Sequence, residues 1–381
     1  MIRLLVTDRN LNVIGDPISR YTEVNVQLQH NQPDAGVVVV PSDNVTAAQL
    51  APGNRLVVLR DQTVFSAGPI RQPGEQSWSI DGDNSGGGTT TIAFAGDFAS
   101  IAAEVAYPDP AHAITAQAAA RRTFTATGAE AVMRQLVTEN VGPTALTARR
   151  IPRLALGALA GVGSAVTMGF RLDYLGDALR AVALAGGDLG FRVRQSGTSL
   201  LFEVFAPRDL SGAVRFSRGL GNLLSYAYRP TAPATTVAIV GDGSGEGTSR
   251  VWAETVAPAA ATWGRMVAVV DRRDTESVTE IAQAGAEALA EGAESAQLET
   301  VTIDTEAVRY GVDYQLGDRV SVELNNGVVV TDVVRAVTLS ATPDGGEVVT
   351  ASVGTQTPTT DQAVVRALRD YARRLRRLEA I

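Results

Sequence analysis

The sequence predicts an α+β protein that is rich in β structure, with antiparallel β-barrel domains, an inserted α/β module and a short C-terminal helix. Three observations predict this class. Short alternating stretches fill the first hundred residues, helical periodicity marks the middle of the chain, and alternation returns near the end. A chain of 381 residues also exceeds the usual size of a single core, so we expect several domains.

The expected domains follow these changes of pattern. Their boundaries are 1–97 for an N-terminal β-barrel domain, 98–212 for the α/β module, 213–298 for returning strands with a linking helix, 299–356 for a C-terminal β-barrel domain and 357–381 for a C-terminal helix.

The sequence pattern of the N-terminal region is typical of a β-sandwich or β-barrel. Its expected strands are 2–7, 22–28, 36–40, 55–60, 63–71, 76–81 and 89–95, with turn residues between them. The alanine-rich segment 98–124 follows, and we interpret it as a loosely packed connector.

Two helices with buried faces are expected in the α/β module. In residues 128–143 and 171–187 the apolar positions recur at helical spacing, and glycines end both patterns. The residues expected on the buried faces are Val132, Met133, Leu136 and Val137 in the first helix and Leu175, Leu179 and Val182 in the second. Ser196-Gly197 then predicts a hairpin.

Strands at 214–230 and 234–241 are expected to lead to a helix over 274–292. Ser277 and Glu280 fit a capping box at its start. The residues expected on its buried face are Val278, Ile281, Ala282 and Leu289, with Gly285 among them.

The C-terminal β region should hold five or six antiparallel strands. Alternation of Tyr310, Val312 and Tyr314 suggests a strand before the one expected at 319–324. So short a region can bury a face by closing into a small barrel or by pairing with an earlier β region. We favour the barrel.

The last helix carries a short heptad seam. Its members are Val364, Leu368, Tyr371, Leu375 and Leu378. Because the seam spans about two heptads, it is too short for an independent coiled coil. We expect it to associate with other copies that the rest of the molecule holds together.

Composition excludes several kinds of chemistry. The 41 acidic and 33 basic side chains give a net charge of −8, which disfavours tight nucleic-acid binding. Lysine and cysteine are both absent, so Schiff bases, phosphate-loop lysines, disulfides and thiolate metal sites are excluded. No export signal is visible. The weakly polar run 154–170 is better explained by a loop and a strand than by a membrane span.

No catalytic, cofactor or metal site is predicted. His30 and His112 are expected to be surface histidines without a catalytic partner. Asp81, Asp83 and Ser85 resemble the start of a calcium loop, but Ile92 stands where a glutamate is required. The glycine-rich 241–247 misses both nucleophile and dinucleotide motifs, and RRLRR at 373–377 is expected to be a solvated helix face. A glycosidase carboxylate pair stays open, because such a pair is defined in space.

The order of parts resembles a known family. An N-terminal β-domain, the segment LDYLGDALRAVALAGGDLGFRV, the return strand RFSRGLGNLLSYAYRP and the terminal RYGVDYQLGDRVSVEL resemble the minor tail proteins of long-tailed actinobacteriophages, within the tail-hub and baseplate-hub superfamily.

The resemblance implies a structural role without catalysis. It implies a homotrimer whose tube-like barrels form a pseudo-hexameric ring, which continues and closes the tail tube at the distal end of a virion. The implied partners are the tail tube or distal tail protein, the tape-measure protein, spike or fibre proteins, and genomic DNA that passes without tight binding. Assembly is expected in the host cytoplasm. The alternatives are a cell-wall glycosidase and a receptor- or carbohydrate-binding tail module.

Overall fold

The computed structural model describes residues 2–42, 48–78, 88–242, 252–272, 278–293 and 295–354. The chain divides into two units. Unit 1 comprises Met1–Ser225 and Thr300–Val353, and unit 2 comprises Tyr226–Glu299 and Gly354–Ile381. Among the described residues strand outweighs helix, at 44% against 16%, so the β-rich class is confirmed. The seam residues at 364–378 lie outside the described residues.

One eight-stranded sheet forms the largest part of unit 1, in the order β13-β19-β20-β2-β3-β7-β6 with β21 paired to β20. Its strands are β2 (Glu23–Gln29), β3 (Ala35–Pro41), β6 (Glu75–Ser77), β7 (Thr89–Ala95), β13 (Arg215–Ser217), β19 (Arg319–Glu323), β20 (Val329–Thr342) and β21 (Gly346–Val353). Strands alternate between buried and less buried positions, as the period of two requires.

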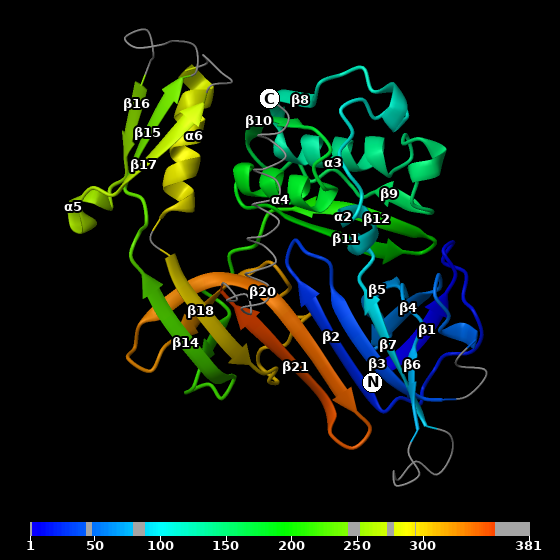
Figure 1. The fold of residues 1–381 in the computed structure, drawn as a ribbon. Helices are drawn as coiled ribbons and strands as arrows, with labels where there is room; N and C mark the ends of the chain where they lie inside the picture. The colour runs from blue at the N-terminus through cyan, green and yellow to red at the C-terminus, as the bar shows by residue number, and fades with distance from the viewer. Residues whose placement is uncertain are drawn as a thin grey trace. The chain divides into compact units, whose positions relative to one another are not determined.

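This sheet joins the two ends of the sequence. Val26 in β2 lies opposite Leu339 in β20, and both side chains are fully buried. The C-terminal strands therefore bury a face by pairing with an earlier β region, the second of the two solutions open to them. Among the described residues no barrel closes, and Figure 1 shows the open sheet with β2 beside β20.

A smaller sheet contains β1 (Ile2–Thr7), β4 (Arg55–Arg60) and β5 (Thr63–Pro69), in the order β1-β4-β5. It approaches the large sheet closely at Gly68. A Cβ on Gly68 would lie 1.7 Å from the carbonyl oxygen of Ala95, the last residue of β7. Glycine is therefore required for the two backbones to pass so near each other.

The α/β module forms its own core in unit 1. It contains α2 (Phe98–Ala102), β8 (Arg122–Gly128), α3 (Ala129–Asn140), β9 (Leu154–Leu156), β10 (Ala165–Phe170), α4 (Leu175–Ala185), β11 (Gly190–Ser196) and β12 (Ser199–Phe205), with 3-10 turns at Ile114–Ala116 and Thr147–Arg149. Figure 1 shows α3 and α4 beside each other near β11 and β12. All seven residues expected on their buried faces are fully buried. The β11–β12 hairpin at Ser196-Gly197 is also confirmed.

Unit 2 contains a three-stranded sheet with a helix on one face. Its order is β16-β15-β17. The elements are β15 (Val237–Asp242), β16 (Trp252–Val256), α5 (Ala260–Trp263), β17 (Val267–Arg272) and α6 (Val278–Glu291), while β14 (Leu223–Thr231) and β18 (Ser295–Thr302) pair with each other. Ile281 and Ala284 of α6 pack on Val240.

The α6 interface differs from the predicted stripe. Ile281 is buried, but Val278 is 76% exposed and Ala282 is also exposed. Gly285 faces the sheet as expected, together with Ala284, and a Cβ on Gly285 would lie 3.1 Å from Thr255 Oγ1. The close approach of α6 to the sheet at Gly285 determines which of its residues make the contact. A pattern of side-chain hydrophobicity does not reveal such an approach. Ser277, the expected cap, lies outside the described residues.

Two further expectations were wrong. Residues 310–316 form a turn and not a strand, because Gly311 has φ +86° and its N–H donates to the Tyr314 carbonyl at 2.9 Å. Segment 98–124 is not a loosely packed connector throughout, because Phe98 and Ile101 of α2 belong to the core of the α/β module.

In the described part of the chain, no helix is both long and apolar enough to cross a membrane. The run 154–170 contains a loop and the strand β10, as the sequence predicted, and begins with the short strand β9, which was not predicted.

Candidate functional site

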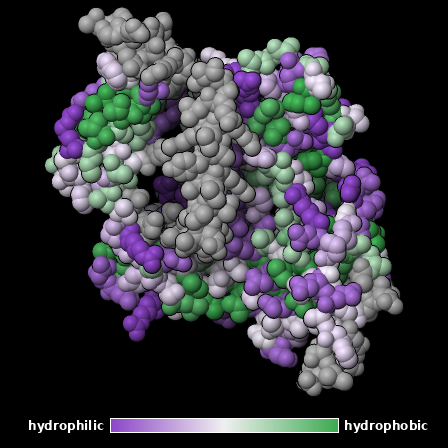
Figure 2. Space-filling view, viewed as in Figure 1, coloured by the Kyte–Doolittle hydropathy of each residue, from purple (hydrophilic) through white to green (hydrophobic). Residues whose placement is uncertain are grey.

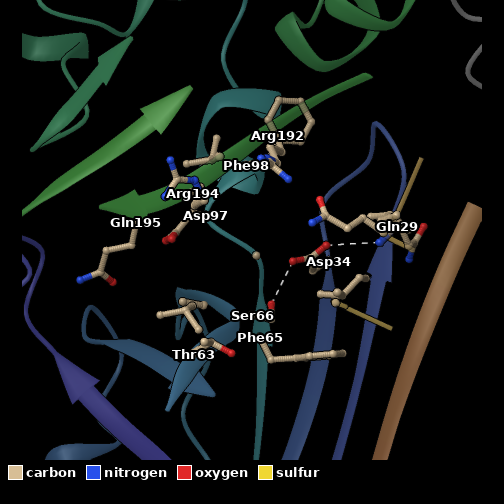
Figure 3. A pocket seen from close by; sticks show the side chains of 18 of the residues that line it. Gln29, Asp34, Thr63, Phe65, Ser66, Asp97, Phe98, Arg192, Arg194 and Gln195 are labelled. Carbon is tan, nitrogen blue, oxygen red and sulfur yellow. Dashed lines mark hydrogen bonds between the residues drawn. The ribbon is translucent and has the colours of Figure 1, made fainter. Parts of the chain in front are cut away.

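A pocket of about 500 Å³ lies in unit 1. Several segments distant in sequence form its walls: the β2–β3 connection, β4 and β5, residues 96–98, β11 and the 309–316 turn. Figure 3 shows labelled side chains from the β2–β3 connection, β5, residues 97–98 and β11 around one space. The pocket is thus a product of the tertiary fold.

Asp34 is the carboxylate with the most unusual surroundings in the pocket. It accepts a hydrogen bond from Ser66 Oγ at 2.9 Å and from the Gln29 N–H at 3.3 Å, as the dashed lines of Figure 3 show. It forms no ion pair with a described residue. Burial therefore raises the pKa of Asp34 to about 6, although both hydrogen bonds lower it.

A second carboxylate, Asp97, is neutralised by a buried arginine. Arg55 donates from Nε and Nη2 to the two oxygens of Asp97, at 2.7 and 2.6 Å. Its Nη1 donates to Gln195 Oε1 at 2.8 Å. The Arg55 and Asp97 side chains are only 5% and 8% exposed. This bidentate pair links the β4 strand to the α/β module through Gln195.

Further ion pairs and aromatic rings complete the walls. Arg194 and Arg192 both donate to Glu203, at 2.6 and 2.9 Å. Arg60 pairs with Glu347 and lies 3.4 Å from Asp304. The rings of Phe65 and Tyr310 meet edge to face, with centroids 5.9 Å apart. The contacts of Arg60 and Phe65 also hold the 309–316 turn and β21 to the small sheet.

The pocket is poorly suited to glycoside hydrolysis. That reaction requires two carboxyl groups, one to donate a proton and one to act as nucleophile or base. Asp34 can hold a proton near neutral pH, but both oxygens of Asp97 are engaged by Arg55. The arrangement instead resembles a set of ion pairs that fixes the junction between sheet and module.

His30 is buried, which corrects the expectation of a surface histidine. It is 7% exposed, and its Nε2 has no hydrogen-bond partner. Its ring meets Phe205 edge to face, with centroids 6.3 Å apart. Burial, assisted by the charge of Arg335, lowers the pKa of His30 to about 4, so the ring is neutral at pH 7.

The other candidates from the sequence are not brought together. His112 is a surface residue as expected, with its side chain 58% exposed, but its Nδ1 lies 2.7 Å from Asp109 Oδ2, an acid partner that we did not predict. Residues 79–87, 243–251 and 355–381 lie outside the described residues, including the calcium-like loop, most of the glycine-rich loop, RRLRR and the seam. Among the residues that the structure describes, no group of His, Asp and Glu could hold a metal ion.

Sequence reasoning missed Asp34, Arg55 and Asp97. Asp34 lies in a turn signal, Pro33-Asp34, and Asp97 follows a strand, so each looked like an ordinary surface residue. Their meeting depends on long-range pairing, such as Ala35 opposite Ala95 in the β3–β7 ladder.

Comparison with known proteins identifies the family. Residues 2–355 match the family described as Siphovirus ReqiPepy6 Gp37-like protein. The chain belongs to this family. No curated protein matches it.

The chain shares its fold with solved phage tail proteins. The 43 kDa tail protein of prophage MuSo2 from Shewanella oneidensis has a TM-score of 0.58 and 10% identity, with 92% of this chain and 98% of that one covered. The tail protein from Neisseria meningitidis MC58 has a TM-score of 0.53 and 11% identity, over 93% and 96% of the two chains. Prophage tail protein gp18 from Listeria monocytogenes EGD-e has a TM-score of 0.53 and 12% identity, over 98% and 99%. At such identities these likenesses show the fold alone.

Proposed function

We propose that this chain is a structural tail-hub protein of a phage or phage-like particle. The observation that carries the proposal is the family match over residues 2–355. The fold likeness to the prophage MuSo2 tail protein, which covers 92% of this chain and 98% of that one, supports it. Because nearly all of each chain is matched, the shared part is the architecture and not one domain in a different setting.

In this proposal three copies form a pseudo-hexameric ring at the distal end of the tail. The open β regions of each copy become tube-like walls when neighbouring copies cover them. The ring continues and closes the tail tube, contacts the tube or distal tail protein and the tape-measure protein, and docks spike or fibre proteins. The predicted domain boundaries and the relation to long-tailed phages of actinobacteria belong to the same proposal.

Exposed apolar side chains of unit 2 support assembly. In unit 2, α6 covers the sheet face that includes Val240 and Val270. By strand alternation, Val267 and Val269 of β17 and Val256 of β16 lie on the opposite face, with 48%, 66% and 51% exposure. Figure 2 shows hydrophobic side chains over this unit, at the upper left. Apolar surface of this kind is typical of protein contacts.

The charge of the chain is compatible with DNA passage. A net charge of −8 distributed around a lumen would repel phosphates and keep the genome from adhering. An enzymatic function has less support, because Arg55 holds both oxygens of Asp97 in the candidate pocket.

Electron microscopy of the purified chain at high concentration tests the ring. We expect threefold rings with a central pore on the scale of a tail tube. If only monomers appear, also after addition of the adjoining tail-tube protein, the hub proposal is wrong.

The proposed role of the seam has its own test. Changing Leu368, Tyr371 and Leu375 together to Ala should weaken trimerisation or spike docking while the thermal transition stays unchanged. Unaltered light scattering and partner binding would exclude the seam from assembly.

The glycosidase alternative is tested by clearing of actinobacterial cell walls. We expect no clearing by the purified chain. If the purified chain clears cell walls and the Asp34→Asn change abolishes this activity, a glycosidase function would replace the structural proposal.

A further inference from the structure

A second pocket, of about 550 Å³, lies elsewhere in unit 1. We call it the arginine pocket, after Arg9, Arg71 and Arg150 that line it. It is bounded by the loop after β1, the start of β4, the end of β5 and residues 150–152 of the α/β module. The net charge of the chain is −8, so three cationic side chains around one cavity give it a local charge of the opposite sign.

These three arginines lack the carboxylate partner that several other arginines of unit 1 have. Arg122, Arg208 and Arg215 all pair with carboxylates. By contrast, no carboxylate in the described part of the chain pairs with Arg9, Arg71 or Arg150. Their guanidinium groups therefore keep several N–H donors for a ligand.

Neutral contacts orient these side chains. Arg150 donates from Nε to the Ala145 carbonyl at 2.6 Å, and Arg71 Nη2 makes a long contact of 3.5 Å with Ser100 Oγ. Arg9 extends over Gly53, where an added Cβ would lie 3.4 Å from Nη2. The backbone there has φ +92°, so glycine both permits the turn and leaves room for the guanidinium.

The charges of the other two ionised residues of the pocket, Arg55 and Asp97, cancel because the two side chains form an ion pair. Arg55 and Asp97 line it as well, and they form the bidentate pair described above. Because both oxygens of Asp97 are bound to Arg55, this carboxylate does not neutralise the three arginines. The excess of three positive charges therefore remains for an incoming ligand.

The floor of the arginine pocket is apolar. Leu11, Ile70 and Leu200 line it with only 8%, 1% and 6% exposure, and prolines 52, 69 and 152 lie around them. No aromatic side chain is among the lining residues. Nucleic acid is a poor fit, since single strands use aromatic stacking and the acidic chain repels phosphate backbones.

We propose that the arginine pocket binds an acidic segment of a partner protein, with an aliphatic side chain between two carboxylates. The guanidinium forks match carboxylates bidentately, and the apolar floor accepts the aliphatic side chain. This inference does not depend on the proposed ring.

The test uses the peptide acetyl-Glu-Leu-Glu-amide and isothermal titration calorimetry on the full chain. We expect saturable binding that weakens as salt rises. Arg9→Gln and Arg150→Gln should each weaken it about tenfold, as expected for the loss of a charge-assisted hydrogen bond. Arg20→Gln, at another exposed arginine of unit 1, is the matched control and should leave affinity unchanged.

Two altered peptides and one inorganic ion separate the possible outcomes. Gln-Leu-Gln should not bind, and Glu-Gly-Glu should bind more weakly than Glu-Leu-Glu. Equal binding of Glu-Gly-Glu, or tighter binding of inorganic phosphate, would overturn the proposal in favour of a simple anion site. Absence of binding up to about 10 mM, beyond the range expected for so small a ligand, would overturn it entirely. Circular dichroism melts confirm that each variant is folded.

Discussion

At the scale of single residues, Asp34 and His30 give unit 1 opposite responses to pH. Both line the candidate pocket, and burial favours the neutral form of each. The pKa of Asp34 is raised to about 6 and that of His30 is lowered to about 4. Between these values the folded protein holds a proton on Asp34 and none on His30, whereas the unfolded chain does the reverse.

Asp34→Asn should stabilise the protein above pH 6. The folded pKa of about 6 exceeds the unfolded 3.8, so folding favours protonation and stability falls as pH rises through this window. The amide oxygen can accept from the Gln29 N–H and the amide nitrogen can donate to the Ser66 hydroxyl, without the buried charge. We expect a gain of about 1–3 kcal/mol in the free energy of unfolding at pH 8 and little change at pH 4. Urea unfolding at both pH values measures this, and equal effects at pH 8 and pH 4 would contradict it.

His30→Leu should flatten the acid side of the stability profile. The folded pKa of about 4 lies below the unfolded 6.5, so His30 contributes stability above pH 6.5 that is lost as pH falls towards 4. The loss amounts to about 3 kcal/mol at most. In thermal melts between pH 7 and pH 4, the stability of the variant should therefore fall less than that of the unchanged chain. The unchanged chain, melted over the same pH range, provides the comparison, and an identical slope for both proteins would contradict the prediction.

At the scale of elements, α4 joins the module through one face only. Leu179 is fully buried, whereas Leu184, on the same helix, is 73% exposed. Leu179→Ala should lower the free energy of unfolding by about 2–5 kcal/mol, because it removes packed methyl groups and leaves a cavity. Leu184→Ala is the same chemical change and should cost less than about 0.5 kcal/mol. Chemical denaturation compares the two, and similar losses would show that α4 is packed differently.

Local patterns in the sequence predicted α3, α4 and the β11–β12 hairpin, because each depends on residues a few positions apart. The alternation of Tyr310 and Tyr314 was misleading for the same reason: a turn at Gly311 can present two tyrosines to one side without a strand. The candidate site was beyond local reasoning. Asp34, Arg55 and Asp97 meet through ladders between distant strands, and their burial follows from that pairing and not from their neighbours in the sequence.

At the scale of the whole molecule, the open sheet face of unit 2 should be a contact in the assembled state. Val269→Asp places a charge on this face, at a position that is 66% exposed, so the isolated chain should fold as before. In the assembly the same charge would be buried without a partner, which is strongly unfavourable. We expect the rings to dissociate in light scattering and electron microscopy.

The matched control is Val312→Asp in unit 1, where the valine is 74% exposed. Its assembly should resemble that of the unchanged chain. If Val269→Asp also assembles normally, the sheet face of unit 2 has another role.

The pairing of β2 with β20 has a consequence for synthesis on the ribosome. Val26 leaves the ribosome 313 residues before its partner Leu339, which corresponds to roughly 15–60 s at ordinary translation rates. During that interval β2 offers an unpaired edge while the α/β module, whose contacts are local, can already fold. Nascent chains are therefore most exposed to misassembly before β20 emerges. The yield of folded protein should therefore increase with added chaperones and at a lower growth temperature, even if the folded protein itself is stable.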